Sequence, residues 1–240
     1  MKTTFALNPA LDVPGMTRRF LTDGRLSIED FLEPQAAEAL HHALTAREDW
    51  VCVINAGDKV FELGKTSLDS MSAEQHSELT ARIYREARDG FQFRFSSIRV
   101  PDSRDQRQVD HDIVHAFAEF MSSAAVLDLL QRVTGRTGLV FADAQATAYH
   151  PGDFLTGHDD DVEGKHRELA YVFGLTPHWR TEWGGLLLFH GEGGAVEGFV
   201  PQFNCLNIFA LPTLHSVSIV APFAGEVRYS VTGWLRTQRP

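Results

Sequence analysis

The spacing of apolar positions along the chain changes near residue 135. Before that point, apolar residues recur mainly every three or four positions, which is typical of helices that pack by one face. This spacing predicts helices over 34–47, 72–90 and 111–135, the last in two pieces. Ser72 and Gln75 form a capping-box pattern at the start of the second helix, and a glycine follows the third.

Strands are predicted mainly after residue 135. Before it, only 50–55 and 90–100 resemble strands, and in the latter Phe91, Phe93 and Phe95 occupy alternate positions. The second half consists of short apolar runs separated by turn residues: GLVFADAQATAYH, ELAYVFGL, GGLLLFH, CLNIFAL, SVSIVAP and VRYSVTGWL. Short strands at such intervals are typical of an antiparallel sandwich or barrel.

The length and composition fit this pattern. A chain of 240 residues, 43% of them hydrophobic, can bury a full core. The sequence contains no internal repeat or obvious linker. We therefore expect a single α+β domain over 1–240, in which a helix-rich part, 1–135, supports a β core formed by 136–240.

The charge of the chain limits the classes of partner, and its cysteine content bears on disulfide bonding. A net charge of −10 disfavours nucleic acid and anionic membranes, so a small molecule, peptide or protein is the expected partner. The two cysteines, Cys52 and Cys205, lie in apolar runs and do not form a disulfide framework. With neither a signal-peptide core nor an apolar membrane-spanning stretch in the sequence, we expect a cytoplasmic location.

The segment YHPGDFLTGHDDD carries the first candidate chemistry. If the chain is extended at His158, this residue and Asp160 project from one face while Asp159 points away. His215, at the start of a later strand, is a suitable third ligand, with His190 as its substitute. Two imidazoles and one carboxylate form the facial triad of non-haem Fe(II) oxygenases. The alternative for an isolated His-x-Asp is a solvated turn.

An arginine in the last predicted strand adds a candidate anion site. Arg228 would project into an apolar β cavity, where a guanidinium is costly unless it pairs with an anion. A guanidinium grips a carboxylate with two hydrogen bonds, which suits a dicarboxylate co-substrate. Arg236 is the rival candidate, but it lies about 26 Å further along an extended strand, too far for both to hold one small molecule.

Three segments between residues 142 and 235 carry a family resemblance: YHPGDFLTGHDD, RELAYVFGLTPHWRTEWGGLLLF and PQFNCLNIFALPTLHSVSIVAPFAGEVRYSVTGWL. In this order they resemble the C-terminal half of the Fe(II)- and 2-oxoglutarate-dependent oxygenases, specifically the prolyl-hydroxylase-like branch. The resemblance implies a double-stranded β-helix, a jelly-roll variant, with flanking N-terminal helices. It also implies Fe(II), 2-oxoglutarate and O2, with ascorbate as a candidate accessory.

The resemblance assigns roles to individual residues. It implies that His158, Asp160 and His215 hold the iron, and that Arg228 holds the distal carboxylate of 2-oxoglutarate. Tyr149 matches a tyrosine whose hydroxyl helps to hold this co-substrate.

Three further positions bear on the co-substrate. Thr232, four residues beyond Arg228 and on the same strand face, is a candidate for an additional hydrogen bond. Gly174 stands where some animal members carry a second co-substrate tyrosine, and Asn204 resembles a recurrent family asparagine.

The expected function is therefore hydroxylation of an unactivated C–H bond, with 2-oxoglutarate converted to succinate and CO2. A prolyl residue in a peptide or protein is the leading substrate by resemblance. The alternatives are a free amino-acid or other small-molecule hydroxylase of the same superfamily, and a non-catalytic metal-binding β-barrel sensor. A nucleic-acid demethylase of similar fold is disfavoured by the acidic charge.

Overall fold

The computed structural model describes residues 4–109 and 112–239. Its helices are α1 (Val13–Asp23), α2 (Pro34–Thr45), α3 (Lys65–Asp69), α4 (Ala73–Glu86), α5 (Arg104–Val109), α6 (Ile113–Met121) and α7 (Ala124–Thr134). Its strands are β1 (Arg25–Ile28), β2 (Val51–Ala56), β3 (Lys59–Leu63), β4 (Phe93–Arg99), β5 (Phe141–Ala142), β6 (Gln145–Tyr149), β7 (Phe154–His158), β8 (Arg167–Leu175), β9 (Leu187–His190), β10 (Val196–Phe199), β11 (Phe203–Ala210), β12 (His215–Val217) and β13 (Arg228–Arg236).

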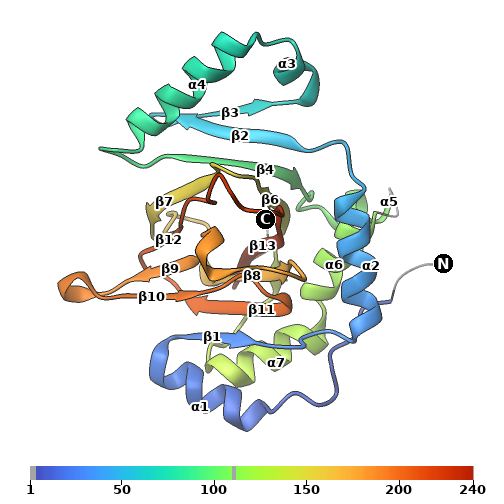
Figure 1. Ribbon diagram of the computed structural model, residues 1–240. Coiled ribbons are helices and arrows are strands. Elements are labelled where there is room, and N and C mark those ends of the chain that lie inside the picture. The colour runs from blue at the N-terminus through green and yellow to red at the C-terminus, as the bar shows by residue number, and fades with distance from the viewer. Residues whose placement is uncertain (1–3, 110–111, 240) are drawn as a thin grey trace.

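The strands form an antiparallel, nearly closed barrel (Figure 1). Neighbouring strands follow the order β1-β11-β8-β13-β6-β4-β7-β12-β9-β10, and β2 and β3 extend the sheet from β4. The two strands at the ends of this order, β1 and β10, are linked by an ion pair between Arg25 and Glu197. The predicted α+β class with a jelly-roll core is therefore confirmed, although β2 and β3 join the same sheet.

Helices cover the outer face of the barrel on two sides. In Figure 1, α1, α2, α6 and α7 lie together near β8 and β11, and α3 and α4 lie against β2 and β3. The main core joins the first group of helices to outward-facing residues of β8 and β11, including Tyr171, Phe173, Leu206 and Ile208. The second group packs through Ile83 of α4.

The two faces of the sheet differ in chemistry. Strand alternation places Ala170, Val172 and Phe209 inside the barrel, where they form a separate apolar cluster with β9 residues. The cross-strand register extends this inner face into rows. One row reads Thr147, Ser230, Gly174 and Cys205, and the next reads Gln145, Thr232, Val172, Asn207 and Ser27. These rows bring polar side chains into an otherwise apolar interior.

The predicted helices agree with the observed ones. The helix predicted from residue 34 is α2, and the capping box of Ser72 and Gln75 is present at the start of α4. The third prediction corresponds to α6 and α7, which ends at Gly135 in a left-handed conformation, while its predicted start at His111 lies outside the described residues.

Among the described residues, no single helix is both long and apolar enough to cross a bilayer. The pair α6 and α7, bent by 49°, meets the length and composition test only when its two helices are taken together.

Candidate metal centre

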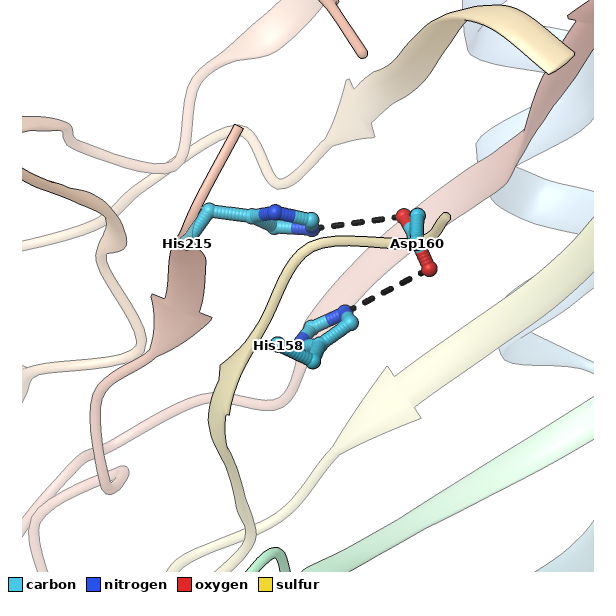
Figure 2. Close-up of side chains that lie close together, drawn as sticks. All are labelled: His158, Asp160 and His215. Atoms are coloured by element: carbon cyan, nitrogen blue, oxygen red, sulfur yellow. Dashed lines mark ion pairs between the residues drawn. The ribbon is translucent and has the colours of Figure 1, made fainter. Parts of the chain in front are cut away.

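Two histidines from neighbouring strands meet an aspartate inside one end of the barrel. His158 ends β7 and His215 begins β12, and the two residues are direct partners in the antiparallel register. The Asp160 carboxylate lies between them: its oxygens are 3.6 Å from His158 Nε2 and 3.4 Å from His215 Nε2 (Figure 2). One donor atom from each residue falls within 4.8 Å of the other two, a spacing compatible with a shared metal ion.

The route by which Asp160 reaches this cluster differs from the predicted one. Strand β7 ends at His158, so strand alternation does not align Asp160 with it, and that explanation was wrong. Instead, Asp160 adopts φ = 62°, a left-handed conformation that turns the chain and directs the carboxylate back. Arg167 stabilises this turn by donating a hydrogen bond to the Asp160 carbonyl (3.2 Å).

The ring orientation of both histidines is fixed by backbone carbonyls. The Nδ1 atom of His158 lies 3.0 Å from the Thr156 carbonyl oxygen, and that of His215 lies 2.7 Å from the Thr213 carbonyl oxygen. A carbonyl can only accept, so each Nδ1 carries the proton and each Nε2 presents a lone pair toward Asp160. Both imidazoles are thus held in the tautomer that a metal ligand requires.

The protonation states also suit a divalent cation. Burial lowers the pKa of His158, and the nearby His215 lowers it further, so its neutral form is favoured. Burial alone would raise the pKa of Asp160, but the adjacent side chains of His215 and His158 outweigh it, and the pKa lies below its usual value. Two neutral imidazoles and one carboxylate form a donor set that fits Fe(II).

A buried arginine occupies the inner face of the barrel away from the metal centre. Arg228 is only 4% exposed and pairs in register with Tyr149, which is 3% exposed. Its guanidinium carbon lies 4.9 Å from the Tyr149 ring centroid, within the range of a cation–π contact. Burial lowers the pKa of Arg228, whereas Tyr149 opposes that shift. Among residues 4–109 and 112–239, no carboxylate lies within ion-pairing distance of Arg228.

The surroundings of Arg228 are tightly closed. Gly185 has φ = 64°, and a Cβ there would lie 3.2 Å from Arg228 Cδ and from the Trp179 ring. The absence of a side chain lets the backbone cover the arginine. On its other side is a small cavity whose lining includes Ser230 and Asn207.

Sequence reasoning did not single out Ser230 or Asn207. Each lies an even number of residues from a recognised inner-face position on its own strand, Arg228 for Ser230 and Phe209 for Asn207. This spacing would have revealed them only after the inner face was known.

The other predicted co-substrate positions are placed as follows. Thr232 is half-buried on the inner face, one row beyond Ser230 and opposite Val172. At Gly174, the Gln202 carbonyl oxygen lies 2.3 Å from where a Cβ would be, so backbone occupies the space of a side chain. Asn204 faces away, because its amide bonds both the N–H and the carbonyl of Leu32.

Neither rival residue lies at the site. Arg236 bonds the carboxylate of Asp143 at 3.2 Å and lies within ion-pairing distance of Asp102 at 3.8 Å. His190 is exposed and contacts Ser216 rather than the metal cluster.

Comparison with known proteins finds a family match over the segment that carries this site. Residues 144–236 match the 2OG-Fe(II) oxygenase superfamily. The matched segment runs from just before β6 to the end of β13 and contains the three metal-site side chains and Arg228. The resemblance seen in the sequence is therefore confirmed. No curated protein sequence matches the chain.

Solved 2OG-Fe(II) oxygenases share the fold. A prolyl-4-hydroxylase from Pseudomonas putida is 17% identical with a TM-score of 0.59, over 94% of this chain and 99% of that one. A 2OG-Fe(II) oxygenase family oxidoreductase from Burkholderia pseudomallei is 11% identical with a TM-score of 0.62, over 100% and 97%. A Trichoplax adhaerens prolyl hydroxylase, solved with a hypoxia inducible factor peptide fragment, is 19% identical with a TM-score of 0.58, over 94% and 89%.

Proposed function

We propose that this protein is an Fe(II)- and 2-oxoglutarate-dependent dioxygenase that hydroxylates a C–H bond. The observation that carries the proposal is the combination of a His-Asp-His cluster with a buried arginine on the inner face of the same barrel, which has no carboxylate partner among the described residues. A metal site alone would also suit a sensor. An additional buried cation requires an anionic ligand, and 2-oxoglutarate supplies a chelating group and a distal carboxylate in one molecule.

Each residue then has a stated task. His158, Asp160 and His215 hold the metal in an orientation set by backbone carbonyls. Arg228 pairs with the distal carboxylate, and the Tyr149 hydroxyl supports the same end. When bound, Fe(II) supplies the redox chemistry by which one atom of O2 enters the product and the other enters succinate, with loss of CO2. The apolar barrel wall excludes water from this reaction.

We further propose a prolyl residue in a peptide or protein as the substrate. Support comes from the solved structures with this fold. Two of them are prolyl hydroxylases, and one of these two was solved with a peptide. The acidic charge of the chain, −10, fits a substrate other than nucleic acid. A free amino acid or another small molecule is the alternative substrate class.

The test is succinate formation by the purified protein. With Fe(II), ascorbate, O2 and isotopically labelled 2-oxoglutarate, we expect labelled succinate, and its rate should rise when a prolyl-containing peptide pool is added. The matched control is His215→Ala, which should form no succinate above background. No succinate from the unmodified protein under any metal would reject the dioxygenase. Stimulation by free proline or other amino acids, and not by peptides, would reject only the peptide substrate.

A further inference from the structure

A tryptophan inside the barrel lies beside the metal site and has an unused hydrogen-bond donor. Trp234 is on β13, where it is the cross-strand partner of Ala170, and its ring packs against the inner apolar cluster that contains Phe209. The ring centroid of Phe209 is 4.6 Å from that of His215. Over the residues that the structure describes, the indole nitrogen of Trp234 is buried and makes no hydrogen bond. A buried N–H without a partner costs free energy unless some group accepts from it.

The carboxylate of Asp160 is the acceptor beside this indole. Arg167 connects the two residues: its guanidinium carbon lies 3.6 Å from the Trp234 ring centroid, and its Nη1 atom donates to the Asp160 carbonyl at 3.2 Å. Burial raises the pKa of the Asp160 carboxyl, and Trp234 is among the side chains, after the two histidines, that lower it. The N–H is the only group on an indole that can donate to a carboxylate, so this edge of the ring faces Asp160.

Contacts on two sides fix where the indole lies. The backbone N–H of Trp234 donates to Asp143 Oδ1 at 2.7 Å, and its carbonyl accepts from the Asp143 N–H at 3.2 Å. The guanidinium of Arg167 covers one face of the ring in a cation–π contact. A ring held by its backbone and by one face keeps its N–H edge directed at the metal site.

Trp179 provides an internal contrast. Its indole N–H donates to the Gly184 carbonyl at 2.8 Å, so this donor is satisfied within the fold. Of these two indoles, only the one beside the metal site keeps its donor unused.

The Asp160 carboxylate needs such a donor. Each residue of the cluster can supply one ligand atom, so one carboxylate oxygen is left for another partner. The two histidines cannot donate to it, because each ring carries its proton on the Nδ1 atom that bonds a backbone carbonyl. Arg167 bonds the carbonyl of Asp160, which leaves the Trp234 N–H for the carboxylate. Carboxylates that bind metals are themselves hydrogen-bonded, and these outer partners orient them.

We infer that Trp234 is a positioning residue for the metal site, whose indole N–H donates to the Asp160 oxygen that the metal leaves free. Arg167 supports this arrangement, because it covers the indole and holds the Asp160 carbonyl. The inference rests on the proposed function and concerns the metal ligand rather than the co-substrate. Removing one N–H from a residue outside the ligand set should therefore weaken metal binding.

The test is the Mn(II) affinity of the full chain, measured by calorimetry without 2-oxoglutarate. Trp234→Phe keeps an aromatic ring beneath Arg167 and removes the N–H. Its Mn(II) affinity should fall by about tenfold or more, the usual effect of losing an outer partner of a metal ligand. The visible absorption spectrum of the Co(II)-loaded protein should change as well, because it reports the geometry of the ligands around the metal.

The matched control is Trp179→Phe, which removes an indole N–H that already has an acceptor. It should lower the melting temperature and leave both the Mn(II) affinity and the Co(II) spectrum unaltered.

A second measurement uses the unmodified protein, so it decides the question even if Trp234→Phe does not fold. The four tryptophans, labelled with 15N in the indole, are followed by NMR while Zn(II), which has no unpaired electrons, is added. The Trp234 signal is the one that persists in Trp50→Phe, Trp179→Phe and Trp183→Phe. Its N–H proton should move downfield and exchange more slowly with solvent, as expected when a hydrogen bond forms.

If Trp234→Phe binds Mn(II) like the unmodified protein, or if the Trp234 N–H signal does not move with Zn(II), the inference is wrong and the proposed function stands. Equal losses of Mn(II) affinity in Trp234→Phe and Trp179→Phe would assign the effect to packing and also overturn it. Failure of the unmodified protein to bind Mn(II) would remove the proposed function, and this inference with it.

Discussion

Inside the barrel, the metal site and the surroundings of Arg228 differ in the charge that each leaves without a partner. At the metal site, the Asp160 carboxylate lies 3.4 and 3.6 Å from the Nε2 atoms of two histidines, so three groups with lone pairs converge and a cation is needed to join them. At the other end, the Arg228 guanidinium has only a phenol hydroxyl and ring beside it and no carboxylate among the described residues. One end is prepared for a cation and the other for an anion.

This difference indicates how the two regions together can select one small-molecule ligand. A metal site with neutral histidines accepts many divalent ions, because affinity alone separates them poorly. A buried guanidinium without a partner favours ligands that bring a negative charge. A molecule that satisfies both ends at once must chelate a metal and carry a second carboxylate, and its binding should depend on both ends in measurably different ways.

The largest effect is expected from Asp160→Ala. The change removes the one charged ligand and leaves two neutral imidazoles, so affinity for Fe(II) or Mn(II) should fall by more than about 100-fold, beyond the effect of changes outside the ligand shell. Succinate formation should be lost with it. Metal titration followed by calorimetry measures the first effect, and labelled 2-oxoglutarate the second. Full activity in this variant would remove the facial triad from the proposal.

An intermediate effect is expected from Arg228→Ala. Loss of the charge-assisted contact should weaken 2-oxoglutarate binding by about 10- to 150-fold, and metal affinity should remain nearly unchanged. Binding of 2-oxoglutarate to the Mn(II)-loaded protein gives the measurement.

Arg236→Ala is the matched control for this change, because Arg236 is bonded to Asp143 away from the site. It should reduce stability and leave 2-oxoglutarate binding intact. If Arg236→Ala weakened 2-oxoglutarate binding and Arg228→Ala did not, the assignment of the anion site to Arg228 would be wrong.

The smallest effect is expected from neutralising the acids beside the metal ligand. Asp159 and Asp161 are exposed, and Asp159 Oδ1 accepts from the Asp161 N–H at 3.1 Å, a bond that asparagine can keep. Asp159→Asn and Asp161→Asn should therefore change metal affinity by no more than about threefold, through the screened local field. A loss as large as that of Asp160→Ala would mean that the turn presents a different carboxylate to the metal.

The sequence predicted the elements more reliably than their mutual placement. Helical spacing and the Ser72 capping box identified α2, α4, α6 and α7, because these signals depend on neighbours within four residues. The short His-x-Asp motif pointed to the right side chains for a cluster. The assumed mechanism was wrong, since strand β7 ends before Asp160 and a left-handed residue completes the arrangement.

The choice between rival residues depended on strand pairing. His215 is the cross-strand partner of both His158 and Phe189, whose side chain packs inside the barrel. His190 follows Phe189 on β9, so alternation turns it to the outside. On β13, Arg228 pairs with Tyr149, whereas Arg236 lies at the far end of the strand, beyond a register shift, opposite Phe141 and Arg167.

By itself, the amino-acid sequence determined four of the helices, α2, α4, α6 and α7, together with the strand-rich second half and the residue types of the site, because these follow from local periodicity and from chemistry. It did not reveal α1, α3 or α5. Which residues of β11 face the barrel interior could not be predicted, because alternation does not say which side is inside. The tertiary structure decided that through the bulge between Phe203 and Cys205 and the pairing of β11 with β8. Register between distant strands fixes the inner face, and that register is an energetic property of the whole barrel rather than of any one segment.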